Sequence, residues 1–65
     1  MPKIGTLKKG YAIVLYRHYN RYIANTKAIR IMDDFEEAKY NAQSMSRCDG
    51  EMYSVYDCEF HKLVY

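Results

Sequence analysis

One segment of this chain has the pattern of an amphipathic helix, and any fold must supply a surface on which that helix can pack. The segment spans residues 33–47 and reads DDFEEAKYNAQSMSR. Its apolar residues recur at intervals of three and four, which places them along one helix face. They are Phe35, Ala38, Ala42 and Met45. Because a helix with one apolar stripe must bury it, the flanking segments are expected to form the other layer.

Both ends of this helix carry capping signals. Asp33 is a favourable N-cap residue, and Glu36 stands three residues later, in the position of a capping box. At the other end, Arg47 suits the helix dipole, and Gly50 can adopt the left-handed conformation that ends a helix. The sequence therefore predicts a helix that begins after Asp33 and ends before Gly50.

The segments before the helix predict two strands. Residues 11–17, YAIVLYR, are an apolar run of β-branched and aromatic residues that is too short for a helix. Residues 21–32, RYIANTKAIRIM, predict a second strand. Residues 18–20 between them predict a turn, because asparagine tolerates positive φ.

Residues 51–65, EMYSVYDCEFHKLVY, predict a third strand after the helix. One face of this strand carries Asp57 and Glu59, which are poor core residues. We therefore expect the other face to point inward. That face carries Tyr56, Cys58 and Phe60.

These elements predict an α+β fold of ββαβ order, in which one helix packs on one face of a three-stranded sheet in two layers. If the third strand lies beside the first, it runs parallel to the second across the sheet. Residues 1–10 are expected to form a basic N-terminal arm, and residues 11–65 a single domain. The expected core consists of Ile13, Leu15, Ile29, Ile31, Phe35, Ala38, Ala42, Met45, Tyr56 and Phe60.

Charge is unevenly distributed along the chain. Residues 1–32 contain seven lysines and arginines and no acidic residue, whereas residues 33–65 contain eight acidic and three basic residues. Such asymmetry favours a charged partner. The alternative is that the two halves neutralise each other across the fold, and the sequence leaves both open.

Catalytic and metal-binding motifs are weak in this sequence. GTLKKG, residues 5–10, has the glycines of a phosphate-binding loop but lacks the lysine and Ser/Thr that must follow them. Cys58 and His61 would point to opposite faces of the expected strand, so they do not make a zinc site or a nucleophile–base pair. The acidic residues 33–37 are explained by the helix start. We expect no enzymatic activity, no metal and no cofactor.

Cysteine content and hydropathy indicate a cytoplasmic protein. The two cysteines, Cys48 and Cys58, are expected to be reduced thiols. The chain has no apolar run of about 18 residues and no secretory signal, so we expect no membrane association. On folding, a domain of 65 residues buries only about 60% of the surface that its unfolded chain exposes. A partner chain would therefore stabilise it.

The segment YRHYNRY, residues 16–22, is the strongest candidate for a binding surface. Tyrosine and arginine are enriched at protein interfaces, but the same residue types stack on bases and neutralise phosphates. Composition does not choose between these ligands. The expected partner-binding residues are Tyr16, Arg17, Tyr19, Arg21, Tyr22, Lys27 and Arg30.

The blocks YAIVLYR, AIRIMDDFEEAKYNAQSM and YSVYDCEF resemble, in their order and in the helix start, small accessory proteins of bacteriophages. The layout is similar to that of small phage proteins that inhibit bacterial RNA polymerase. The resemblance covers about residues 11–60, and the usual Ser/Thr before the acidic residues is missing from DDFEEA. It implies a protein that binds and disables one host enzyme or defence complex in the host cytoplasm.

We therefore expect a non-catalytic binding protein that inhibits or modulates a host macromolecular complex by steric occlusion. A defence nuclease complex or RNA polymerase would be such a target. The alternative is a small protein that binds RNA or single-stranded DNA through the basic, tyrosine-rich hairpin. A homodimer would fit either function.

Overall fold

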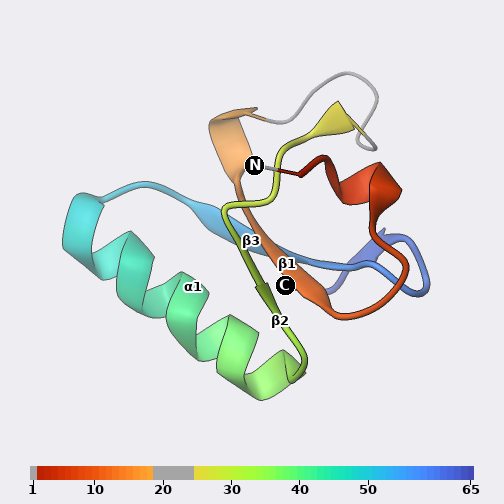
Figure 1. Cartoon of the computed structure of the whole chain (residues 1–65). Helices are drawn as coiled ribbons and strands as arrows, with labels where there is room; N and C mark the ends of the chain where they lie inside the picture. Colours follow the sequence, from red (N-terminus) through yellow and green to blue (C-terminus); the bar gives the residue numbers. More distant parts are fainter. Residues whose placement is uncertain (1, 19–24) are drawn as a thin grey trace.

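The computed structural model describes residues 2–18 and 25–65, and Figure 1 shows their arrangement. One α-helix lies beside an antiparallel sheet. In chain order the elements are the 3-10 helix η1 (Ile4–Thr6), β1 (Tyr11–Leu15), the 3-10 helix η2 (Tyr16–His18), β2 (Arg30–Met32), α1 (Phe35–Asp49), β3 (Tyr53–Asp57) and β4 (Lys62–Leu63). The predicted α+β class with one α-helix is confirmed for the described residues, but their sheet has four strands where three are expected.

The sheet has the order β2-β1-β3-β4, and β1 is antiparallel to both of its neighbours. β2 and β3 therefore run in the same direction on either side of β1, as expected for a third strand beside the first. Ile13 of β1 lies opposite both Arg30 of β2 and Val55 of β3. Because side chains alternate along a strand, this register fixes which residues share a face.

The fourth strand exists because the chain turns sharply after β3. The Asp57 carboxylate accepts hydrogen bonds from the backbone N–H groups of Glu59 (2.9 Å) and Phe60 (3.1 Å), and His61 adopts a φ of 53°. An aspartate that binds the backbone just ahead of it favours a turn over a continuing strand. The predicted strand 51–65 is therefore wrong beyond Asp57, and Phe60, expected in the core, is 69% exposed.

β2 is much shorter than the predicted strand 21–32. Only Arg30–Met32 forms the strand, Lys27 makes an isolated bridge, and residues 21–24 lie outside the described residues. Because β2 is at the edge of the sheet, Ile31 is 45% exposed despite its expected place in the core.

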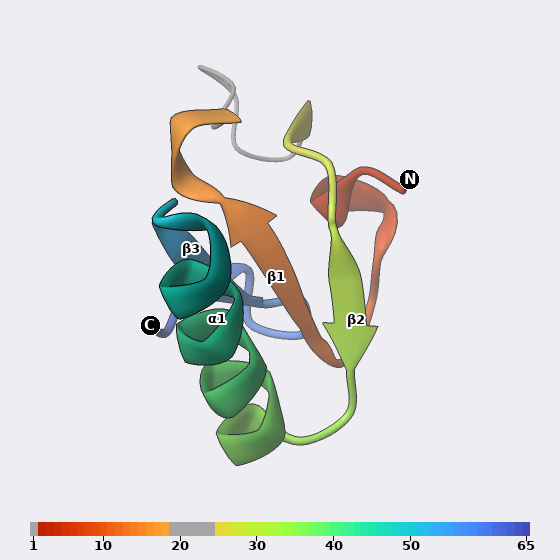
Figure 2. The ribbon, with the colours of Figure 1, turned by 90° about the vertical axis from the view of Figure 1, so that its left-hand side faces the viewer.

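Helix α1 packs on one face of the sheet through the predicted apolar stripe (Figure 2). The buried cluster between helix and sheet consists of Ile13, Ala38, Ala42 and Val55, with Phe35 and Met45 packed against it. The helical periodicity of the sequence therefore identified the correct face. No helix within the described ranges combines the length and the apolar character that a bilayer span needs.

The helix begins one residue later than predicted. Asp34, not Asp33, is the N-cap, because its carboxylate accepts a hydrogen bond from the backbone N–H of Glu37 at 2.9 Å. The two positions look alike in the sequence, since each has a glutamate three residues later. The predicted helix end is confirmed, because Gly50 caps α1 with a φ of 73°.

The face of the sheet opposite α1 is partly covered by the N-terminal segment (Figure 2). The Ile4 N–H donates to the Thr26 carbonyl at 2.9 Å, and the Ala28 N–H donates to the Pro2 carbonyl at 2.8 Å. These bonds hold Ile4 in a second buried cluster. Its other members are Ala12, Val14, Ala28, Tyr56 and Cys58, with Leu7 packed against them. Residues 1–10 were expected to form a basic arm. Instead, part of this segment covers the sheet face opposite α1 and contributes the apolar side chain of Ile4 to the core.

Candidate functional site

The end of β1 brings part of the predicted binding segment beside the start of β3. Leu15 lies opposite Tyr53 in the antiparallel ladder. The Tyr16 N–H continues that ladder by donating to the Met52 carbonyl at 2.9 Å. The residues that follow β1 are therefore fixed to the residues that precede β3.

An ion pair and two exposed apolar side chains occupy this end of the sheet. Arg17 Nε lies 3.3 Å from Glu51 Oε2, and both side chains are accessible to solvent, so the pair contributes little to stability. Tyr16 is 53% exposed and Met52 is 66% exposed. We call these four residues, Tyr16, Arg17, Glu51 and Met52, the Tyr16–Met52 end.

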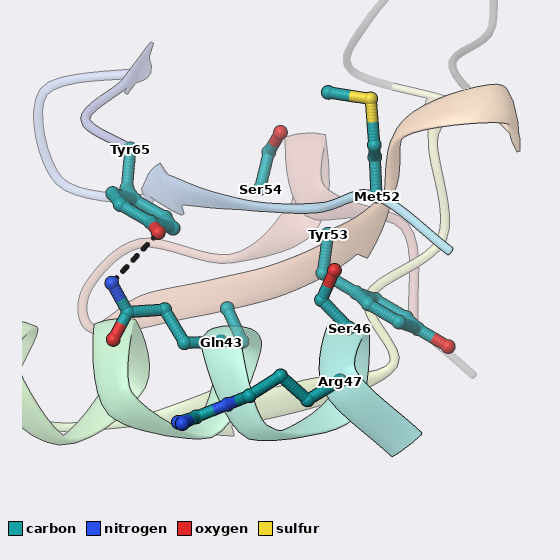
Figure 3. Close-up of a pocket in the computed structure, with 8 residues that line it drawn as sticks. Gln43, Ser46, Arg47, Met52, Tyr53, Ser54 and Tyr65 are labelled. Atoms are coloured by element: carbon teal, nitrogen blue, oxygen red, sulfur yellow. Dashed lines mark hydrogen bonds between the residues drawn. The ribbon is translucent and has the colours of Figure 1, made fainter. Parts of the chain in front are cut away.

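A groove of about 640 Å³ lies between α1 and β3 and shares Met52 with the Tyr16–Met52 end (Figure 3). We call it the helix–strand groove. Gln43, Ser46 and Arg47 line it from α1, and Tyr53, Ser54 and Tyr65 line it from β3 and the residues after β4. A volume of this size is typical of binding sites.

Internal contacts hold several of the polar side chains in this groove. Gln43 Nε2 donates to the Tyr65 hydroxyl at 2.9 Å, as drawn in Figure 3, and Ser46 Oγ donates to the Glu51 carbonyl at 2.5 Å. Lys39 Nζ lies 5.6 Å from the centre of the Tyr65 ring, within the range of a cation–π interaction. The Tyr65 ring is therefore fixed against α1.

Tyr53 is fixed by a hydrogen bond to Asp49. Its hydroxyl donates to the Asp49 carboxylate, which also accepts from the backbone N–H of Glu51 at 2.9 Å. The hydrogen bond from Tyr53 is the main cause of a lowered pKa of Asp49, and the bond from Glu51 adds to it. Both bonds stabilise the charged carboxylate. The same hydrogen bond raises the pKa of Tyr53, because it stabilises the neutral phenol that donates it.

Arg47 differs from these neighbours. It is exposed in the last turn of α1, and its guanidinium makes no hydrogen bond or ion pair with any residue in 2–18 or 25–65. A guanidinium has five N–H donors in a planar arrangement that fits a carboxylate or phosphate. The groove therefore offers a cation to an external anion.

The structure brings together only part of the predicted binding set. Tyr16 and Arg17 lie in the Tyr16–Met52 end, whereas three of the predicted residues lie outside the described part of the chain. They are Tyr19, Arg21 and Tyr22. Lys27 and Arg30 lie in the segment on the other side of β1 from Glu51 and Met52.

The two residues on the far side of β1 have different surroundings. Arg30 Nη1 donates to Asn41 Oδ1 of α1 at 3.1 Å, which directs it toward the helix. Lys27 lies opposite Lys3 in the isolated bridge, and both lysines are exposed.

Sequence reasoning does not identify Met52, Arg47 or Tyr65 as site residues. In the sequence, the position of Arg47 is explained by its favourable interaction with the C-terminal end of the helix dipole. The signal that could find Met52 is the strand order, because a third strand antiparallel to the first places the residue before Tyr53 opposite the residue after Leu15.

A smaller hollow of about 450 Å³ lies near the start of α1. Tyr11 and Phe35 line it with their ring centres 5.7 Å apart, and the exposed Phe60 also contributes. The carboxylate in its lining, Asp57, already accepts two backbone hydrogen bonds. The helix–strand groove is therefore the stronger candidate.

The expected strand geometry at Cys58 and His61 is wrong, because both lie in the turn after β3. Cys58 is buried and His61 is exposed, and Cys48 and Cys58 are both free thiols. Burial raises the pKa of Cys58. In the described ranges, no group of three or more His, Cys, Asp or Glu side chains lies close enough to hold a metal ion.

Comparison of the chain with protein-family models, with curated proteins and with solved structures found no match.

Proposed function

We propose that this protein is a non-catalytic binding protein that docks on a macromolecular protein complex and inhibits or modulates it by steric occlusion. The observation that supports this best is the exposure of Tyr16 and Met52, which are joined by a backbone hydrogen bond, with the Arg17–Glu51 ion pair formed by their neighbours in sequence. Tyrosine, methionine and arginine are enriched at protein interfaces. Buried aromatic and arginine side chains also dominate the binding energy of such interfaces.

The backbone beneath these side chains favours binding. Tyr16 is hydrogen-bonded to Met52 at the end of a ladder of five residue pairs between β1 and β3. Docking therefore has to order side chains but not the backbone that carries them. A smaller ordering cost leaves more of the contact energy as affinity.

The resemblance to small phage accessory proteins supports a target in a bacterial host. Under this proposal the protein acts in the host cytoplasm on a complex such as RNA polymerase or a defence nuclease. It needs no cofactor, since it acts by covering a surface that another molecule must reach.

The test is capture of partners from a bacterial lysate by the tagged chain, with and without nuclease, followed by quantitative mass spectrometry. We expect one protein complex in near-stoichiometric amount in both halves. Met52→Ser should reduce its yield strongly, because loss of a hot-spot side chain costs about 2 kcal/mol, or about thirtyfold in affinity.

Tyr40→Ser is the matched control, because Tyr40 is 65% exposed on α1 and does not line the groove. It should leave capture unchanged. Circular dichroism shows whether both variants keep the fold. Equal yields for folded Met52→Ser and wild type, or no captured protein at all, would overturn the proposal.

One observation favours the second candidate function, binding of RNA or single-stranded DNA. Lys3 and Lys27 are directly opposite each other, and like charges in that position destabilise a strand pair. Neither is neutralised by an acid, because Arg17–Glu51 is the one ion pair within residues 2–18 and 25–65. A phosphate backbone would relieve this repulsion.

Fluorescence titration with labelled oligonucleotides at several salt concentrations tests this second function. Lys27→Gln should weaken binding similarly for all sequences and reduce the salt slope by about one unit. Lys62→Gln, an exposed lysine of β4, is the control for the change in net charge. An affinity that does not depend on salt would exclude a phosphate-binding surface.

A further inference from the structure

The two ends of the helix–strand groove are aromatic. Figure 3 shows Tyr65 at one end and Tyr53 at the other, with Ser46 of α1 between them. Both rings are held in place, Tyr65 by Gln43 and Lys39 and Tyr53 by Asp49. A space bounded by two fixed rings suits an aromatic or long aliphatic side chain, because ring–ring and ring–methylene contacts need little rearrangement.

The acidic side chains at the groove have partners among the described residues, whereas the arginine that lines it does not. Asp49 accepts hydrogen bonds from Tyr53 and from the backbone of Glu51, and the Glu51 side chain pairs with Arg17. The Arg47 guanidinium has no such partner in the described part of the chain. An incoming ligand therefore gains most by bringing an anion to Arg47.

We propose that the helix–strand groove binds an acidic peptide segment of the protein partner, with an apolar side chain between Tyr53 and Tyr65 and a carboxylate on Arg47. This inference rests on the proposed function, since it names the partner chemistry of that surface. Met52 lines the groove and also belongs to the Tyr16–Met52 end, and its side chain projects from the side of β3 away from α1 (Figure 3), so a segment lying in the groove would end beside the proposed interface.

An NMR titration of the 15N-labelled full chain tests this directly. The probe is a blocked pentapeptide with a central phenylalanine between glutamates, and the comparison peptide has lysines in place of the glutamates. We expect shifts at Gln43, Ser46 and Ser54 and a preference of about tenfold for the acidic peptide, because an arginine–carboxylate contact is a charge-assisted hydrogen bond.

Three variants separate a carboxylate contact from a general effect of charge. Arg47→Gln should remove the tenfold preference, and Arg47→Lys should retain part of it because a lysine keeps the charge but not the planar pair of donors. Lys9→Gln should keep the full preference, because Lys9 precedes β1 at the end of the strand away from Tyr53.

Equal affinity for the two peptides, shifts that map away from the groove, absence of binding, or an unchanged preference in Arg47→Gln would each overturn the inference. The titration uses a synthetic peptide, so it decides this inference without the cellular partner. The proposed function is decided by capture from lysate. A partner captured equally by Arg47→Gln and wild type, but lost with Met52→Ser, would retain the proposed function and reject the acidic segment.

Discussion

The Tyr53 hydroxyl donates a hydrogen bond to the Asp49 carboxylate, which joins the last residue of α1 to the first residue of β3. The bond lowers the pKa of Asp49 and raises that of Tyr53. A lowered carboxyl pKa adds stability above the unfolded-state pKa, and this is lost as pH falls through the folded-state value. A raised phenol pKa adds stability below its unfolded-state pKa, and this is lost as pH rises through the folded-state value.

Tyr53→Phe therefore should be less stable than wild type at neutral pH, and the difference should shrink in acid as Asp49 becomes protonated. The pKa of Asp49 should rise toward its ordinary value, because the Tyr53 hydrogen bond is the largest cause of its shift. Urea unfolding at several pH values and a carboxyl NMR titration measure these effects. Tyr40→Phe, on the exposed side of α1, should change neither, and an unaltered Asp49 pKa in Tyr53→Phe would contradict the assignment.

The position of the helix cap gives a second prediction. Asp34→Ala should lower the free energy of unfolding by about 1 kcal/mol, because the Glu37 N–H loses its acceptor. Asp33→Ala removes the same charge one residue earlier and should have a much smaller effect. Chemical denaturation of both variants measures the difference, and equal losses would mean that charge near the helix dipole matters and the cap does not.

The helix was predictable from the sequence, whereas the turn after β3 and the helix–strand groove were not. The α1 stripe and Gly50 follow from periodicity and backbone preference within a few residues. β4 was missed because alternation continues through Phe60, whereas the turn is imposed by the Asp57 carboxylate. The helix–strand groove was missed for a different reason, since Tyr65 is brought to α1 only by the strand order.

The cover formed by the N-terminal segment gives a third prediction. Ile4 is fully buried although it directly follows Lys3 in the segment expected to form a basic arm. Ile4→Val should lower the free energy of unfolding by about 1 kcal/mol, because it removes one buried methylene and leaves a cavity. Ile31→Val, at a site that is 45% exposed, should cost less than about 0.5 kcal/mol. Equal costs in denaturant unfolding would show that residues 2–4 leave the sheet in solution.

Two glycines in the left-handed region of the backbone give a fourth prediction. Gly10 and Gly50 have φ values of 87° and 73°. Alanine in the left-handed region costs about 1 kcal/mol at either position. A Cβ at Gly10 would also lie 3.0 Å from the Met32 carbonyl oxygen, whereas a Cβ at Gly50 meets nothing within 4 Å. Gly10→Ala should therefore be clearly less stable than Gly50→Ala in thermal unfolding, and the reverse order would contradict the close approach of β2.

The two thiols should differ widely in reactivity. Cys58 is fully buried in the cluster that contains Ile4, and burial raises its pKa, so both access and thiolate formation are suppressed. Cys48 is exposed near the end of α1. Alkylation followed by mass spectrometry should modify Cys58 at least about a thousandfold more slowly than Cys48, because Cys58 reacts only when the fold opens.

Ile4→Val should accelerate the labelling of Cys58 and leave that of Cys48 unchanged, since only Cys58 shares a cluster with Ile4. Similar rates for the two thiols in wild type would mean that the N-terminal cover opens without unfolding of the sheet.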